Sequence, residues 1–164
     1  MFQAKAIETD DNPAFYRDLA QQLDGLLQGE TDAIANAANT AALLFTSLPD
    51  LNWAGFYFLR KPDELVLGPF QGKPACVRIT VGRGVCGAAV KERRTMRIED
   101  VHAFADHIAC DSASRSELVV PLFRGQDIIG VLDLDAPIPA RFDADDQSGV
   151  EALATIYMKA SGAL

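Results

Sequence analysis

The chain has 164 residues, of which 49% are hydrophobic and 23% charged, and this composition is typical of one globular domain with its own core. Its 15 Lys and Arg against 23 Asp and Glu leave a formal net charge of −8, which argues against a nucleic-acid or anionic-membrane surface because both need a basic footprint. No apolar run is long enough for a transmembrane helix, and the N-terminus lacks the basic and apolar regions of a signal peptide. We therefore expect a cytoplasmic protein, in which three cysteines do not form a permanent disulfide framework.

Two helices are predicted within residues 1–50. The first begins at Asn12 and Pro13, with Asn12 as the N-cap. Its apolar face at helical spacing consists of Phe15, Leu19, Leu23 and Leu26. The second helix covers residues 31–46 and ends before Pro49. Its expected buried stripe consists of Ile34, Ala38, Ala41, Ala42 and Phe45.

Short runs rich in β-forming residues follow. Three strands are predicted over residues 53–59, 64–70 and 75–80, and the turns between them favour an antiparallel meander. A short helix over residues 85–92 and a weak strand over residues 96–98 lead into a long polar connection, residues 99–115. Loops of this length inside a compact domain are usually functional or disordered.

The clearest hairpin joins residues 116–124 to residues 127–135, and a closing helix begins near Asp143. Hairpins outnumber crossover helices, so the order predicts an α+β fold: a central antiparallel sheet of about six strands with helices packed mainly on one face. We expect one domain over residues 1–164, with N-terminal helices in residues 1–50 and the sheet, an active-site loop and the C-terminal helix in residues 51–164.

The three cysteines differ in their surroundings. A free cysteine is commonly a small buried hydrophobe, and this suits Cys86, which lies between Val85 and Gly87. Cys110 lies in a polar loop segment beside His107, where solvent or substrate can reach a thiol and a neighbouring base can favour the thiolate. Cys76 is distant in sequence but can meet another cysteine in space, which would form a transient redox pair.

Metal binding is the alternative use of these thiols. Together with His102 and His107, the cysteines supply enough ligands for a zinc ion. They form no CxxC or HxxxH pair, however, and the spacing from His107 to Cys110 is a weak signal by itself. We therefore expect no metal.

Acidic residues mark the last predicted hairpin. Strand alternation places Asp133 and Asp135 on one face, and Glu117 opens the preceding strand. A solvated face would explain alternating acids as well. In a central strand, however, buried carboxylates need a partner, and such a group can attract an ammonium ion or act as an acid with a raised pKa.

Two aromatic residues share a face of the first predicted strand. Trp53 and Tyr57 are four residues apart, so alternation brings them to the same side. Core packing is one explanation. A Trp beside a Tyr on a strand that lines a pocket can also enclose a methyl or sulfur group.

Several blocks of the chain resemble one enzyme family. These blocks are NWAGFYFL, LVLGPFQGKPACVRI, GRGVCGAAV, EDVHAFADHIACDSASRSELVVPL, GVLDLDAP and PARFDADDQSGVEAL. The chain resembles the free methionine-(R)-sulfoxide reductases, which are stand-alone GAF domains, over about residues 52–153. Residues 79–82 depart from the family by lacking its Pro-Phe pair.

The resemblance implies a thiol-dependent reduction of free L-methionine-(R)-sulfoxide to methionine without a cofactor. Cys110 matches the attacking cysteine and Cys76 the main resolving cysteine, whereas Cys86 matches a third cysteine used in substrate handling or an alternative disulfide. The remaining site residues match the family's aromatic wall, Trp53 and Tyr57, and its pocket acids, Glu117, Asp133 and Asp135. Those acids hold the ammonium group and engage the sulfoxide oxygen.

The expected reaction converts Cys110 to a sulfenic acid, which condenses with Cys76 to a disulfide that thioredoxin reduces. By family analogy we also expect a homodimer.

The alternative is a non-catalytic GAF module that binds a small ligand and signals through a partner. That alternative needs an output domain, for which a chain of 164 residues has no room, and it leaves two cysteines without a role. The sequence therefore favours the enzyme.

Overall fold

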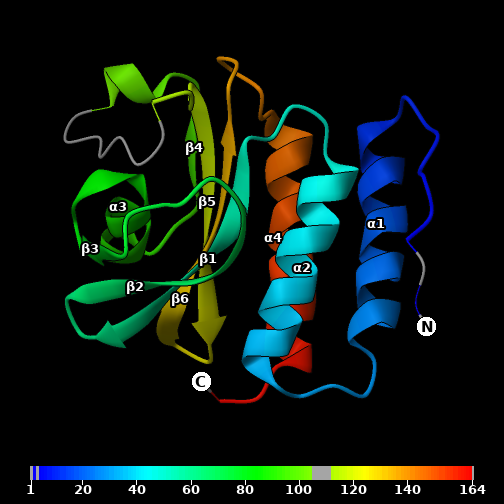
Figure 1. Cartoon of the computed structure of the whole chain (residues 1–164), viewed down its shortest axis with the longest axis horizontal. Helices are drawn as coiled ribbons and strands as arrows, with labels where there is room; N and C mark the ends of the chain where they lie inside the picture. The colour runs from blue at the N-terminus through cyan, green and yellow to red at the C-terminus, as the bar shows by residue number, and fades with distance from the viewer. Residues whose placement is uncertain (1, 3, 105–111, 164) are drawn as a thin grey trace.

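Six strands form one antiparallel sheet in the order β3-β2-β1-β6-β5-β4 (Figure 1). The structure is a computed structural model that describes residue 2, residues 4–104 and residues 112–163. Within these residues the strands are β1 Trp53–Lys61, β2 Glu64–Gly72, β3 Arg78–Thr80, β4 Met96–Ile98, β5 Ser116–Arg124 and β6 Asp127–Ala136.

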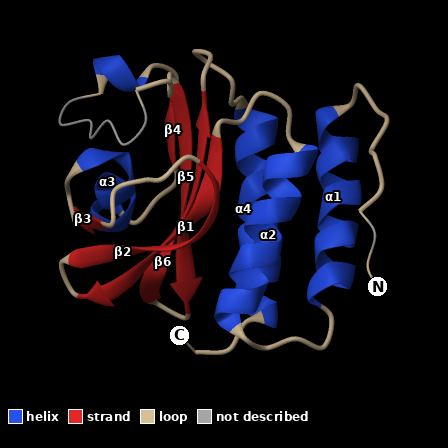
Figure 2. Ribbon diagram, in the orientation of Figure 1, coloured by secondary structure: helices blue, strands red, loops and turns tan. Residues whose placement is uncertain are grey.

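Helices cover the two faces of this sheet unequally. The helical segments are α1 Asn12–Leu27, α2 Ala33–Ser47, α3 Gly84–Glu92, the short 3₁₀ helix η1 Val101–Ala103 and α4 Ala144–Ala160. Helices α2 and α4 lie against one face with α1 on their outer side, and α3 lies on the opposite face (Figure 2). This confirms the predicted α+β architecture with helices mainly on one face. None of the helices in the described segments is long and apolar enough to span a bilayer.

Strand alternation divides the core into two parts. Phe56, Phe58 and Leu132 point toward the helical layer of α1, α2 and α4, where they join the larger apolar cluster. Trp53 and Tyr57, on the same strand as the two phenylalanines, point to the other side and join a smaller cluster with α3. The sheet therefore has one mainly apolar face and one face on which apolar and acidic side chains meet.

Side-chain caps fix the N-termini of α2 and α4. Asp143 and Asp146 form a reciprocal capping box at the start of α4. This confirms the predicted start of the helix near Asp143. The Asp32 side chain accepts hydrogen bonds from the first turn of α2. The prediction for α1 was wrong by one residue, since its N-cap is Asp11 and Asn12 is already helical. The reason is that Pro13 lies in the first helical turn whether the N-cap is Asp11 or Asn12, so it does not distinguish the two.

The buried stripe predicted for α2 is right at Ala41, which is fully buried, but wrong at two of its five positions. Ile34 is 46% exposed, and Ala38 is exposed as well. The buried side instead contains Asn36 and Thr40. Thr40 Oγ1 donates to Asn36 O at 2.7 Å and Asn36 Nδ2 donates to Ser161 Oγ at 3.2 Å, whereas Asn36 Oδ1 is buried without a hydrogen-bond partner among the described residues.

Contact between α1 and α4 depends on a glycine. A Cβ added at Gly149 would lie 2.1 Å from Cγ of the Tyr16 ring, which is buried between the helices. We expect Gly149→Ala to lower the free energy of unfolding by about 2–3 kcal/mol, because the ring or the helix must move. Denaturant unfolding measures this effect.

Gly25→Ala on α1 is the matched control. Its added Cβ meets only a Phe2 ring atom, at 4.0 Å, and alanine favours a helix by about 0.5–1 kcal/mol over glycine. This variant should be as stable as the wild type or more so. Equal stability of the Gly149→Ala protein and the wild type would contradict the close packing of α1 on α4.

Candidate active site

Three acidic side chains lie on adjacent strands of the sheet face that α3 covers. Trp53 on β1 is the register partner of Asp135 on β6, and Asp135 is in turn the partner of Glu117 on β5. Two residues along β6, Asp133 is the partner of Gly55. Directly opposite residues in antiparallel strands have Cβ atoms about 4.5–5.5 Å apart, so this register gathers the three carboxyl groups into one patch.

The patch lies deep in the protein. Glu117 and Asp133 are only 6% and 5% exposed, whereas Asp135 is half-buried and lies nearer the rim. The Oδ1 atom of Asp133 is buried and has no hydrogen-bond partner among the described residues. A buried acceptor without a partner is uncommon in folded proteins, and beside two further carboxyl groups and a thiol it can serve a ligand or a catalytic role.

Helix α3 brings a thiol to these acids. Cys86 is 4% exposed, and its Sγ lies 4.0 Å from Oε1 of Glu117. The close approach of α3 requires Gly87, because a Cβ there would lie 2.5 Å from the carbonyl oxygen of Thr80. Sequence reasoning placed Cys86 among apolar neighbours but did not foresee its contact with Glu117, since the two residues belong to elements far apart in sequence.

Burial and nearby negative charge raise the pKa values of Glu117, Asp133 and Cys86 in this cluster. Burial raises the pKa of the Glu117 carboxyl well above its ordinary value, and the charges of Asp133 and Asp135 raise it further. Burial also raises the pKa of the Asp133 carboxyl, and the negative charge of Asp135 raises it further. The pKa of the Cys86 thiol is raised by burial and then by Asp133 and Glu117. Cys86 is therefore a neutral thiol at neutral pH and a weak nucleophile.

An aromatic stack borders the acids. Trp53 stacks on Tyr57 with ring centroids 5.8 Å apart and on Phe70 with centroids 5.3 Å apart. The sequence predicted the first pair but missed Phe70. Phe70 is the register partner of Gly55, which has no side chain at this crowded point, so its place in the stack depends on a strand register that the sequence pattern did not supply.

Cys76 lies beside this stack. It was predicted within a strand, but that strand begins only at Arg78, so Cys76 is half-buried in the preceding loop. Tyr57 donates its hydroxyl hydrogen to the carbonyl oxygen of Cys76 at 3.0 Å, and Trp53 Nε1 donates to Lys73 O at 3.1 Å. These two bonds hold the loop over the aromatic stack. The strand prediction failed near its start, where Pro74 has no backbone N–H group to donate to a neighbouring strand.

The structure thus groups six of the eight predicted site residues: Trp53, Tyr57, Cys86, Glu117, Asp133 and Asp135. Cys76 adjoins them through its backbone. Cys110 and the neighbouring His107 lie outside the described residues, so their predicted roles stay predictions. His102 is exposed in η1, with Nδ1 3.0 Å from an oxygen of Asp100.

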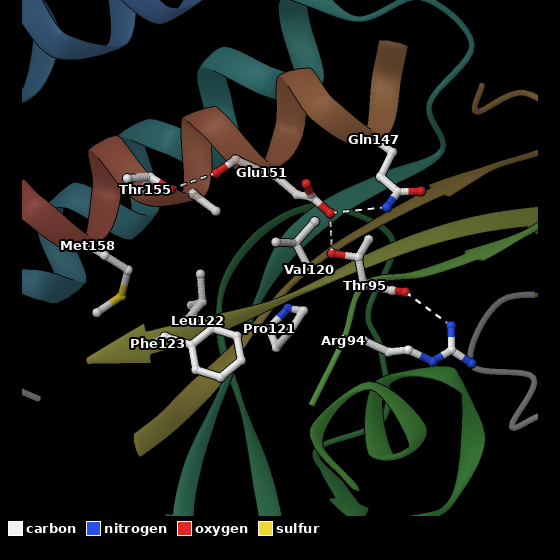
Figure 3. A pocket seen from close by; sticks show the side chains of 11 residues that line it. Arg94, Thr95, Val120, Pro121, Leu122, Phe123, Gln147, Glu151, Thr155 and Met158 are labelled. Carbon is white, nitrogen blue, oxygen red and sulfur yellow. Dashed lines mark hydrogen bonds between the residues drawn. The ribbon is translucent and has the colours of Figure 1, made fainter. Parts of the chain in front are cut away.

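A separate cavity of about 730 Å³ lies between α4 and the β4–β5 end of the sheet (Figure 3). No predicted site residue lines it. Its carboxylate, Glu151, already accepts hydrogen bonds from Thr95 Oγ1 at 2.6 Å and Gln147 Nε2 at 3.1 Å, as the dashed lines in Figure 3 show. The acidic patch, with its unpartnered Asp133 oxygen, is therefore the stronger candidate for chemistry.

The raised pKa values also predict a pH-dependent stability. The folded state binds protons at Glu117 and Asp133 more tightly than the unfolded chain, whose carboxyl pKa values are about 4. Their stabilising contribution is complete below that value and is lost as the pH rises toward the raised folded-state pKa. We expect the free energy of unfolding of the Glu117→Gln protein to fall less steeply with rising pH than that of the wild type, by up to about 1.4 kcal/mol per pH unit.

Urea unfolding of the reduced protein between about pH 5 and pH 8 measures this slope. Asp127→Asn, at an exposed position on the same hairpin, is the matched control and should follow the wild-type curve. A Glu117→Gln curve parallel to that of the wild type would contradict the protonated state of Glu117.

This architecture is that of a GAF domain, and the GAF domain family matches residues 22–160 of the chain. The chain is 57% identical over 139 residues to the free methionine-R-sulfoxide reductase of Escherichia coli (strain K12), covering 85% of this chain and 84% of that protein. It is 40% identical over 143 residues to the free methionine-R-sulfoxide reductase of Saccharomyces cerevisiae, covering 83% and 79% of the two chains.

A solved structure agrees with these sequence relationships. The free methionine-R-sulfoxide reductase of Neisseria meningitidis, determined in complex with its substrate, superimposes with a TM-score of 0.93 at 46% identity, covering 98% of this chain and 95% of that one. The chain belongs to the free methionine-(R)-sulfoxide reductases, which are oxidoreductases that act on a sulfur group. The family expected from the sequence is confirmed.

Proposed function

We propose that this protein reduces free L-methionine-(R)-sulfoxide to L-methionine with its own cysteines as the reductant. The observation that carries the proposal is the buried acidic patch beside the aromatic stack, in a chain of this family. Glu117 and Asp133 supply protonated carboxyls, and Trp53 and Tyr57 supply an apolar wall. Methionine sulfoxide carries a polar S–O group and an apolar methyl group, so a site that binds it needs both features.

The buried carboxyls activate the sulfoxide. Its sulfur becomes electrophilic when the oxygen is protonated or strongly hydrogen-bonded. Burial raises the pKa values of Glu117 and Asp133 and so favours their protonated forms, from which either can donate to the oxygen. The unpartnered Oδ1 of Asp133 is available for a polar group of the substrate.

The half-buried Asp135 is suited to a different role. It lies nearer the rim than Glu117 and Asp133, and we assign it to the substrate ammonium group. An ion pair of this kind selects a free amino acid, because a methionine sulfoxide inside a peptide has no ammonium group to offer.

The thiol steps complete the reaction. The Cys110 thiolate attacks the protonated sulfoxide sulfur, an S–S bond forms, and the S–O bond breaks as the oxygen leaves as water. Water then attacks the Cys110 sulfur, the S–S bond breaks, methionine leaves with that electron pair, and Cys110 becomes a sulfenic acid. Cys76 then attacks that sulfenic sulfur, water leaves, and a disulfide forms. A dithiol protein, thioredoxin by family analogy, supplies two electrons and two protons to restore both thiols. Cys86, a buried neutral thiol against Glu117, serves substrate handling in this scheme.

The cellular setting is part of the proposal. A reducing cytoplasm keeps Cys76 and Cys110 available as thiols between turnovers. Homodimer formation, also expected from the family, is tested by the mass of the purified protein in solution. Neither property is required by the chemistry of the site.

A single-turnover assay of the reduced protein tests this function. The protein receives free L-methionine-(R)-sulfoxide, the S epimer or a peptide-bound R sulfoxide, and methionine and lost thiols are counted. We expect one methionine per chain from the free R epimer alone, with two thiols lost. No methionine from any substrate would favour a ligand-binding GAF module instead.

Asp135→Asn tests the ammonium contact. The amide keeps the shape but loses the charge, so we expect kcat/KM for free methionine sulfoxide to fall about 30–100-fold, mainly through KM. Asp127→Asn on the same strand is the control and should leave kcat/KM unchanged. A large loss of stability in the Asp135→Asn protein, with normal kcat/KM, would instead indicate a structural carboxylate.

A further inference from the structure

We propose that Cys86, Glu117 and Asp133 form a binding site for Zn²⁺ in the reduced protein. One thiol and two carboxyl groups converge there from α3, β5 and β6, and their ligating atoms all lie within 4.8 Å of one another. The amino-acid sequence carries no signal for this site, because the three residues are 31 and 16 positions apart and match no short metal-binding motif.

The burial of the cluster indicates a ligand rather than a solvated group of acids. All three side chains are more than nine-tenths buried. The Asp133 Oδ1 atom has no hydrogen-bond partner among the described residues, so its lone pairs are directed at nothing that satisfies them. The neighbouring charges that act on these groups come from acids, Asp135 among them, and such surroundings favour a cation.

Geometry and ligand type both fit zinc. Zinc takes thiolate sulfur at about 2.3 Å and carboxylate oxygen at about 2.0–2.2 Å, which places tetrahedral ligands roughly 3.5 Å from one another. The Cys86 Sγ to Glu117 Oε1 distance is 4.0 Å, so a small side-chain movement closes the site. Mg²⁺ and Ca²⁺ are poorer candidates, since they avoid sulfur and need more oxygen ligands than this cluster provides.

Binding involves no electron transfer. The Cys86 thiol releases its proton to solvent as the Zn–S bond forms, and any proton on the two carboxyls leaves in the same way. Three protein ligands leave the fourth tetrahedral position for water. The ion would then occupy the place that the proposed function assigns to the substrate's polar groups. Zinc should therefore inhibit reduction reversibly, and this consequence, unlike the site itself, rests on the proposed function.

Co²⁺ titration tests the site without relying on activity. Co²⁺ takes the place of Zn²⁺ in tetrahedral sites, and a thiolate ligand gives it a charge-transfer band in the near ultraviolet. We use the Cys76→Ser/Cys110→Ser chain, in which Cys86 is the remaining cysteine. We expect one Co²⁺ per chain with this band and with visible bands typical of tetrahedral coordination, and we expect Zn²⁺ to displace the cobalt.

Two variants in the same background assign the ligands. Cys86→Ser should abolish the charge-transfer band, and Glu117→Gln should weaken Co²⁺ binding about 100-fold, because losing even a group that orients a ligand costs about 10–100-fold. Asp127→Asn should bind as the parent chain does. Circular dichroism confirms that each variant is folded, and Glu117→Gln keeps the test decisive where Cys86→Ser fails to fold.

The outcomes separate the zinc site from the proposed function. A parent chain without the charge-transfer band overturns the zinc site, even where the wild type reduces methionine sulfoxide normally. A band that appears in a chain whose wild type releases no methionine supports the zinc site and removes the reductase proposal. Unchanged cobalt affinity in the folded Glu117→Gln chain also overturns the proposed ligand set.

Discussion

Cys110→Ser is expected to lower turnover of free L-methionine-(R)-sulfoxide at least about 1,000-fold, to the background rate. In the proposed reaction this residue supplies the sulfur that receives the oxygen, and a serine hydroxyl cannot form a sulfenic acid. Cys86 cannot replace it, because burial and two acidic neighbours raise the pKa of its thiol and keep it neutral. Methionine release, measured by chromatography with excess reductant, reports the loss.

Ser112→Ala, two residues further along the chain and exposed, is the matched control and should retain wild-type turnover. The Cys110→Ser protein should still bind free methionine sulfoxide, since the acids and the aromatic stack are unchanged. Turnover near the wild-type rate in this variant would remove Cys110 from the role of nucleophile.

Cys76→Ser is expected to stop the reaction after a single turnover with thioredoxin as reductant. The variant still attacks the sulfoxide and releases one methionine per chain, but its sulfenic acid has no resolving partner. A sulfenic-acid trapping reagent should therefore label Cys110 in this variant and not in the wild type. Mass spectrometry of the labelled protein locates the modification.

A small thiol provides the control for this experiment. Because a small thiol can reduce a sulfenic acid directly, dithiothreitol should restore multiple turnovers to the Cys76→Ser protein, whereas thioredoxin should not. Normal multiple turnover with thioredoxin would transfer the resolving role to Cys86. The buried position of Cys86 against Glu117 argues that Cys86 does not take over this role and that the Cys76→Ser protein stalls with thioredoxin.

The candidate site was only partly predictable from the sequence. Alternation along β6 was enough to place Asp133 and Asp135 on one face, because a strand has a fixed period of two. The same rule paired Trp53 with Tyr57. Phe70 escaped notice because its contact with Trp53 depends on the register between β1 and β2, which a single strand does not encode.

Errors in the predicted fold have a common cause. The stripe on α2 was misplaced because alanines occur on all sides of this helix, so the choice of buried face depends on which neighbours cover it. A tertiary hydrogen bond from Asn36 to Ser161 and a bond within the helix from Thr40 to Asn36 then partner these side chains, although their residue types suggest exposure. Cys76 fell outside its predicted strand because Pro74 interrupts the pairing before Arg78.

The sequence by itself determined the α+β architecture, the family and the identity of the acids, since these depend on local periodicity and on the order of residues along the chain. Only the tertiary structure decided which of those acids are buried and which thiol lies against them. Glu117 and Cys86 are 31 residues apart, and their 4.0 Å contact exists because α3 packs on the sheet. A pKa depends on the water and charge around a group, so the raised pKa values of the Cys86 thiol and the Glu117 carboxyl follow from packing and not from residue type.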